Sequence, residues 1–230
     1  MLGASPLPLR SDGFGEVLPT PKALRNRQLT ARDTLPAPTD GRFHSWIGPI
    51  TAALRERMGD TYRAGCPVPL SRLTYLQVSF RGFDHRAHTG ELVVAGSVAP
   101  TVVKVFRSLY DQGFPIEQMV LPTTADVTAR PTGDGNDTAA FVCRAARGQT
   151  RFSAHAYGLA IDVNPFQNPE QKADLVLPEL AGAYTDRSWV RPGMMLPGSR
   201  AAGAFTRAGW TWGGTFHSLK DYMHFSENGQ

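Results

Sequence analysis

Alternating apolar and polar positions in the first half of the chain predict a pair of strands. Leu76, Val78 and Phe80 alternate with more polar neighbours across residues 75–80, which is typical of a strand with one buried face. The apolar run at 91–95 (ELVVA) predicts a partner strand, and the polar segment between the two predicts a loop. We therefore expect these two strands to pair.

Three segments are predicted to be helical. Apolar residues recur every four positions from Trp46 to Met58, which indicates an amphipathic helix ending at Gly59. Residues 102–110 and 201–208 predict two more helices, each followed by a glycine that favours helix termination.

Two more short strands are predicted at 116–121 (IEQMVL) and 159–163 (LAIDV). Strands and helices follow one another without a regular βαβ rhythm and without an internal repeat. This order favours an α+β fold, a small antiparallel sheet with flanking helices, over a doubly wound parallel sheet. Residues 1–42 are rich in proline and lack apolar periodicity, so they predict an extended arm, either disordered or laid across the surface. Residues 43–230 are then one domain.

Composition excludes several classes of protein. The net charge is +4, but the arginines are spread along the chain without a run of like charges, so a nucleic-acid partner is not expected. No apolar run approaches the roughly 20 residues that a transmembrane helix needs. Residues 1–8 lack the basic and apolar regions of a secretory signal.

Cys66 and Cys143 are compatible with one disulfide, which would add about 4–5 kcal/mol in the chain-entropy model, or with two buried thiols.

Two short segments carry the candidate chemistry. Asp162 lies within an otherwise apolar run, where an isolated carboxylate is costly unless it is paired or binds a metal. His155 precedes that run, and Gly158 allows a sharp turn between them. Asp221 and His224 are three residues apart near the end of the chain, a spacing that can bring both groups to one site.

These groups match the needs of a catalytic zinc site. Such a site uses three protein ligands and leaves one position open for water. A fourth, free carboxylate then serves as general base. Ordinary hydrogen-bonded pairing of the same side chains is the alternative that the spacing alone leaves open.

The combined motifs resemble peptidase family M15, the group of D-alanyl-D-alanine carboxypeptidases and L-alanyl-D-glutamate endopeptidases. The resemblance rests on SxHxxGxAxD at 153–162 and DxxHF at 221–225, with similar flanks at 141–144 (FVCR) and 209–214 (GWTWGG), and it covers roughly residues 60–226. It implies a zinc peptidase domain with the Hedgehog/DD-peptidase fold.

The resemblance also implies a role for individual residues. His155, Asp162 and His224 match the ligands of one Zn²⁺ per chain. Asp221 matches the general base, a position where many relatives have glutamate. Arg144 resembles the arginine that polarises the scissile carbonyl.

Six further residues have weaker assignments. Ser153 is expected to line the site and help hold the substrate. Trp210 and Trp212 alternate in a strand-like run, where core packing is the default and a wall of the substrate cleft is the alternative. His217 competes with His224 as third ligand, but it lacks a carboxylate three positions earlier, so a surface role is expected. His85 and His88 are expected to be solvated loop histidines.

The predicted function is therefore hydrolysis of the stem peptide of bacterial peptidoglycan, by a carboxypeptidase or an endopeptidase. The alternative is a non-catalytic zinc module of the same fold that binds cell wall or another protein. Because this substrate lies outside the membrane, we expect a monomer secreted to the cell envelope or beyond, with a leader that this sequence does not contain, or a phage lysin.

Overall fold

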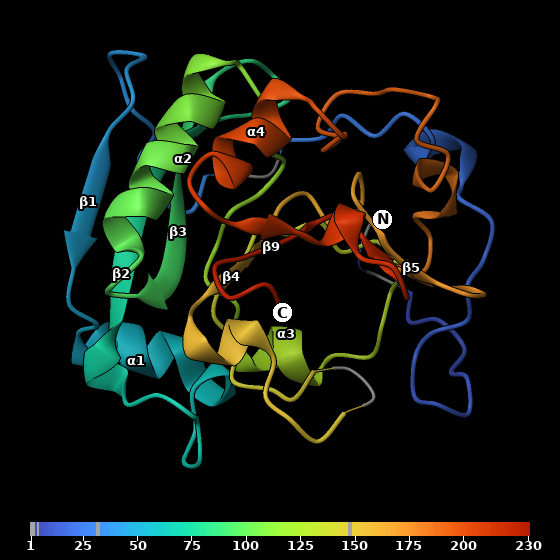
Figure 1. Ribbon diagram of the computed structural model, residues 1–230, viewed down its shortest axis with the longest axis horizontal. Helices are drawn as coiled ribbons and strands as arrows, with labels where there is room; N and C mark the ends of the chain where they lie inside the picture. The colour runs from blue at the N-terminus through green and yellow to red at the C-terminus, as the bar shows by residue number, and fades with distance from the viewer. Residues whose placement is uncertain (1–2, 4, 31–32, 147–148) are drawn as a thin grey trace.

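A hairpin of two long antiparallel strands forms one side of the molecule (Figure 1). β2 (Leu73–Arg81) pairs with β3 (Ala87–Ala95) along its whole length, from Leu73 opposite Ala95 to Arg81 opposite Ala87. Both predicted strands are confirmed, and both extend into the segment predicted to be a loop. The structure is a computed structural model and describes residues 3, 5–30, 33–146 and 149–230.

One helix covers a face of this hairpin, and a second packs beside that helix. α2 (Ala99–Asp111) lies along β2 and β3 and turns Val102, Phe106 and Leu109 into the core, as predicted. α4 (Arg200–Thr206) packs beside α2, where Phe205 meets Phe106 edge to face. Their shared core is continuous with the apolar residues of the strands that carry the candidate site.

The helix predicted from Trp46 to Met58 is wrong in its first half. Residues 45–48 form strand β1, which pairs with the free edge of β2, and only Ala52–Met58 is helical (α1). Pro49 lies between the two elements and disfavours helical backbone at the residue before it. Trp46 consequently lies 48 % exposed on the edge strand, not on the buried face of a helix.

The predicted strand at 116–121 is not among the strands of the described residues. Ile116, Met119 and Leu121 are buried as expected, but the backbone forms only isolated bridges, between Arg81 and Pro115 and between Gln118 and Asp137. The segment is a buried connection, because its main-chain groups bond to several different neighbours and not to one strand.

Two smaller antiparallel sheets lie beside this core and are assembled from segments far apart in the sequence. One has the order β4-β9-β7 and the other the order β6-β5-β8. Their strands are β4 (Ala160–Asp162), β5 (Glu170–Lys172), β6 (Leu175–Leu177), β7 (Thr211–Trp212), β8 (Lys220–Asp221) and β9 (His224–Ser226). Short helical turns complete the described chain: η1 (Lys22–Leu24), η2 (Gly59–Thr61), η3 (Leu70–Arg72), α3 (Thr124–Thr128), η4 (Ala154–Tyr157), η5 (Gly182–Tyr184) and η6 (Gly213–Thr215).

The architecture is therefore α+β with small antiparallel sheets and few helices, as predicted. Within the described residues, no helix has the length and apolar character required to cross a bilayer.

Cys66 and Cys143 form a disulfide, which decides between the two possibilities that the sequence left open. It joins the loop after η2 to the segment that leads into the candidate site.

The N-terminal arm lies against the body of the molecule, on the side opposite β1 (Figure 1). Leu24 packs among Phe166, Tyr184 and other apolar side chains, and Leu7 is also buried. Arg27 is only 3 % exposed. The described part of the arm is therefore extended and laid across the surface, with apolar and charged side chains inserted into the body.

Candidate metal centre

Three of the predicted site residues converge on one point. His155, Asp162 and His224 each offer a ligand atom, and these atoms all lie within 4.8 Å of one another. Asp162 and His224 lie directly opposite each other on β4 and β9, so their side chains are on the same face of that sheet. Strand pairing thus brings together residues separated by 62 positions.

A tight turn brings His155 to the same point. Ser153 caps η4 by accepting a hydrogen bond from the main-chain nitrogen of His155, and Gly158 ends this turn in the left-handed conformation at φ +69°. A Cβ atom at Gly158 would lie 2.4 Å from the main-chain nitrogen of Ala95 on β3. The predicted turn at Gly158 is therefore present, and glycine is required there both for the backbone conformation and for the close approach to β3.

Both imidazoles are held by main-chain carbonyls on their outer side. The Nδ1 atom of His155 is 2.6 Å from the carbonyl oxygen of Ala140, and the Nε2 atom of His224 is 2.6 Å from that of Gln230. The oxygens of Ala140 and Gln230 can only accept hydrogen bonds, so each of these two ring nitrogens carries a proton. The remaining nitrogens therefore direct their lone pairs inward, as in metal sites whose ligands are oriented by outer hydrogen bonds.

The inner atoms form a compact triangle with the carboxylate. Nε2 of His155 and Nδ1 of His224 are 3.2 Å apart, and each lies within 3.2 Å of an Asp162 oxygen. Two inward lone pairs and a carboxylate at these distances repel one another unless a cation lies among them. A proton on one imidazole meets that need in the metal-free protein, and a bound metal ion meets it with both imidazoles neutral.

Burial and charge act in opposite directions on these groups. Burial lowers the pKa of His224, but the hydrogen bond and the charge of Asp162 outweigh this and raise the pKa to about 9. For Asp162, burial raises the pKa, whereas the charges and hydrogen bonds of His155 and His224 hold it well below its usual range. The carboxylate is therefore ionised and ready to bind a cation.

Asp221 lies close to this group on a separate strand. Its charge contributes to the raised pKa of His224, and β8 places it directly opposite Glu170 on β5. The sequence did not indicate this pairing, because the two strands lie 51 residues apart and no local pattern reveals their register. Asp221 is thus the further carboxylate whose charge reaches His224, and Glu170 is its cross-strand neighbour.

Arg144 and Ser153 lie on adjacent strand-like segments that lead to His155. The main-chain nitrogen of Ser153 donates to the carbonyl of Arg144 at 3.1 Å. The Ser153 hydroxyl caps η4, which gives it a structural contact in addition to the predicted contact with substrate.

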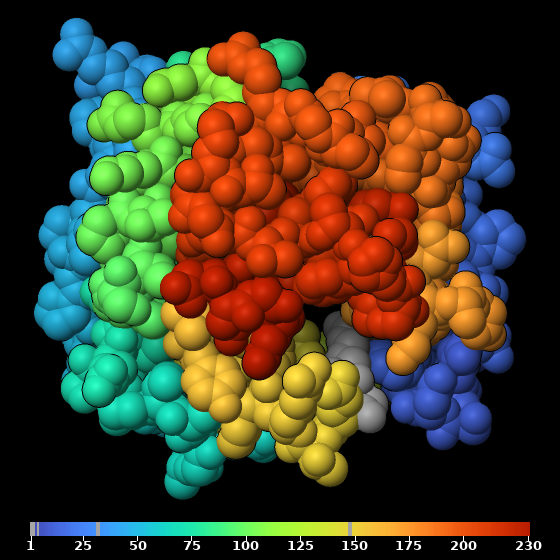
Figure 2. Space-filling view, in the orientation of Figure 1, coloured from blue at the N-terminus to red at the C-terminus, as the bar shows by residue number. Residues whose placement is uncertain are grey.

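Figure 2 shows that the molecular surface is hollowed between the segment around residues 150–160 (yellow) and the C-terminal segments (red).

The two tryptophans predicted to be near the substrate are core residues. Trp210 and Trp212 are 3 % and 4 % exposed, and Trp212 stacks on Phe225 while its Nε1 donates to the carbonyl of Tyr222 at 2.9 Å. This agrees with core packing, the default for such a pair, and we assign them no contact with substrate.

The remaining histidines lie outside the candidate site. His217 is exposed, in line with the predicted surface role. His88 was predicted to be a solvated loop residue, but it is buried on β3, where its two nitrogens bond to Asp33 and Asp84 at 2.7 and 3.1 Å. Strand β3 begins earlier than the alternation pattern indicated, and this draws His88 into the sheet.

Comparison with known proteins identifies one family. Residues 147–227 match the model of a D-alanyl-D-alanine carboxypeptidase family, a segment that contains all three converging side chains and Asp221. Searches of curated proteins and of solved structures found no match.

Proposed function

Because residues 147–227 identify the chain as a member of the M15 peptidase family, we propose that it is a zinc-dependent peptidase acting on the stem peptide of bacterial peptidoglycan. The observation that carries the proposal is the convergence of His155, Asp162 and His224, with both imidazoles held by carbonyls so that their free nitrogens meet at the carboxylate. The Hedgehog/DD-peptidase fold implied by the family is part of this proposal.

The donor set fits zinc. Two imidazoles and one carboxylate are a known ligand combination for catalytic zinc, and they leave a coordination position for water. When bound, zinc would lower the pKa of a water ligand to about 7 and polarise the scissile carbonyl. His155, Asp162 and His224 would hold the ion, one per chain.

Other residues of this chain move the proton and support the charge. Asp221 takes a proton from the attacking water and delivers it to the nitrogen of the leaving amine as the C–N bond breaks. Its proximity to His224 supports this role, because the base must reach the water beside the ligands. Arg144 stabilises the negative charge that develops on the carbonyl oxygen.

The substrate we propose is the stem peptide, cleaved either at D-Ala-D-Ala by a carboxypeptidase or at L-Ala-D-Glu by an endopeptidase. The description of the matching family favours the carboxypeptidase. Such a substrate places the protein in the cell envelope or outside the cell.

The experiment is digestion of purified muropeptides followed by mass spectrometry. We expect loss of a terminal D-alanine, or a cut within the stem peptide, that stops with a chelator and returns when zinc is added. The Asp162→Asn variant is the control for a contaminating hydrolase. Zinc binding without cleavage of any muropeptide would instead identify a non-catalytic zinc module of the same fold.

A further inference from the structure

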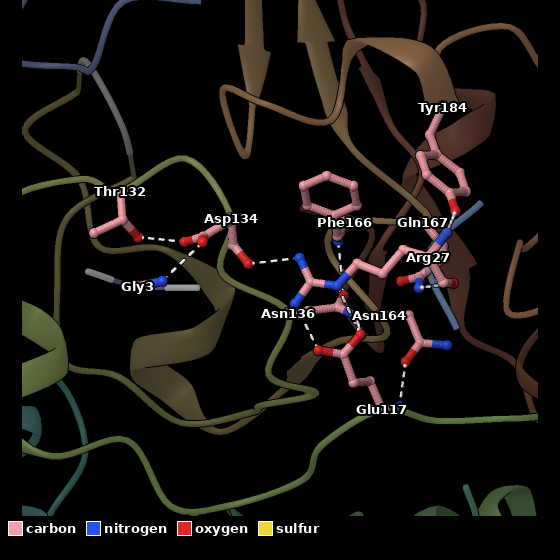
Figure 3. A network of polar contacts seen from close by, with 10 residues as sticks. All are labelled: Gly3, Arg27, Glu117, Thr132, Asp134, Asn136, Asn164, Phe166, Gln167 and Tyr184. Atoms are coloured by element: carbon pink, nitrogen blue, oxygen red, sulfur yellow. Dashed lines mark hydrogen bonds and ion pairs between the residues drawn. The ribbon is translucent and has the colours of Figure 1, made fainter. Parts of the chain in front are cut away.

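One buried ion pair joins the N-terminal arm to the body. Nε and Nη2 of Arg27 donate to the two carboxylate oxygens of Glu117 at 2.8 and 2.6 Å (Figure 3). Nη1 of Arg27 donates to the carbonyl of Asp134 at 2.8 Å, and the guanidinium lies 4.5 Å from the centre of the Phe166 ring. Both charged side chains are nearly inaccessible, with 3 % and 8 % exposed.

This ion pair continues into the segment beside the metal centre. The side-chain amide of Asn136 donates to Glu117 at 2.7 Å, and its oxygen accepts from the main chain of Phe166 at 2.8 Å (Figure 3). The main-chain nitrogen of Glu117 donates to the side chain of Asn164 at 3.2 Å, two residues beyond Asp162. Glu117 is thus bonded to both segments that flank the ligand strand β4.

The segment that begins at Asn136 makes two contacts with metal-ligand residues. Ala139 pairs with Asp162 through two main-chain hydrogen bonds of 3.1 and 2.9 Å. Ala140 supplies the carbonyl that bonds to Nδ1 of His155. A shift of this segment would therefore move the Asp162 backbone and release the ring of His155.

We propose that Arg27 is a positioning residue for the metal centre, acting through Glu117 and Asn136 on the carbonyl of Ala140. The inference rests on the proposed function for the identity of the metal. The effect of Arg27 on the ring of His155 does not depend on that function. An uncompensated buried carboxylate at Glu117 reorganises its surroundings, and the 134–140 segment is bonded to this ion pair through Asp134 and Asn136. The arm is thereby part of the machinery that orients the ligands, although it contributes no ligand itself.

The test compares Arg27→Met with two matched variants of the same arm. Arg25→Met removes an equal charge from an exposed position, and Leu24→Ala weakens the apolar packing of the arm without removing any hydrogen bond of the polar path. Two properties are measured: zinc affinity by competition with a chromophoric chelator, and solvent exchange of the His155 Nδ1 proton by NMR in metal-free protein. Melting temperature reports on general destabilisation.

We expect Arg27→Met to weaken zinc binding about 10- to 100-fold, the range measured for outer partners of metal ligands, and to speed proton exchange by a comparable factor. Leu24→Ala should lower the melting temperature while both properties stay within about threefold of the unsubstituted protein, and Arg25→Met should change nothing. If Arg27→Met does not fold, Asn136→Ala cuts the same path and leaves the ion pair intact.

The outcomes separate the two proposals. A folded Arg27→Met or Asn136→Ala variant that keeps either property unchanged overturns the positioning role. If the unsubstituted protein binds no zinc, the proposed function fails, and the exchange rate of the His155 proton alone decides whether Arg27 positions that ring.

Discussion

Nε2 of His155 and Nδ1 of His224 face each other at 3.2 Å, with an Asp162 oxygen within 3.2 Å of each. Their outer nitrogens donate to main-chain oxygens, so the inner nitrogens meet at the carboxylate and share a single cation, which in the metal-free protein is a proton on His224. This arrangement is stable only with a cation among the three groups, and the turn at Gly158 and the disulfide support it.

Removing the carboxylate should abolish tight metal binding. Asp162→Asn keeps the size of the side chain but leaves a neutral amide, so zinc affinity should fall by more than the roughly 100-fold upper range for outer partners of metal ligands. His217→Gln, at an exposed position outside the site, is the control and should bind zinc like the unsubstituted protein. Equal affinities in the two variants would place the metal elsewhere.

Asp221→Asn should separate metal binding from catalysis. The variant should retain its zinc, because the ligands are untouched, and lose about 10²- to 10⁴-fold in kcat, the usual contribution of a general base. Metal analysis and the muropeptide assay measure the two properties independently. Asp221→Glu restores a carboxylate and should recover activity. Full activity in Asp221→Asn would exclude this residue as the base.

The metal-free protein should lose stability as the pH rises through about 9. A histidine whose pKa is raised by folding stabilises the protein fully below its unfolded pKa near 6.5, and this contribution disappears above the folded value, here about 9 for His224. The difference corresponds to about 3 kcal/mol in the free energy of unfolding. Denaturant unfolding of chelator-treated protein between pH 6 and pH 10 measures it.

The control for this pH dependence is His224→Gln, which has no imidazole to titrate and should lack the decline. Zinc binding should release about one proton at neutral pH, since the metal takes the place of the proton on His224. A metal-free protein equally stable at pH 6.5 and pH 9.5 would contradict the raised pKa of His224.

Reduction of the disulfide should destabilise the fold. The bond between Cys66 and Cys143 closes a loop across a sequence separation of 77, which predicts about 4–5 kcal/mol in the chain-entropy model. Denaturant unfolding with and without reductant measures the loss. A variant with serine at both positions should be equally destabilised and should not respond to reductant. An unchanged midpoint on verified reduction would show that the loop is already ordered without the bond.

Gly158→Ala should be more harmful than a comparable change elsewhere. Alanine at φ +69° is strained by about 1–3 kcal/mol, and its Cβ would also collide with the main chain of β3. Gly209→Ala carries the strain alone, because at φ +88° its Cβ would meet no described atom within 4 Å. Unfolding free energies of both variants give the cost of the collision by difference, and equal losses would argue against close packing on β3.

Much of the central fold could be predicted from local patterns. The strands around Val78 and Val93 follow alternation, and α2 follows helical spacing, because each of these elements buries one continuous face. The four-residue spacing from Trp46 predicted a helix, but the spacing runs across Pro49. Trp46 instead lies exposed on the edge strand β1. Local pattern failed again at 116–121, where Ile116, Met119 and Leu121 are buried but the segment forms only isolated bridges among the described residues.

The sequence by itself determined which residue types are available for the site: His155, Asp162, Asp221 and His224, with glycine at the turn. It also carried the family resemblance, since motif spacing is a property of the chain alone. Only the tertiary structure decided which atoms meet. The register of β4 on β9, the carbonyls behind each imidazole and the path from Arg27 all join residues distant in sequence, and such contacts depend on how separate segments pack, which local spacing does not encode.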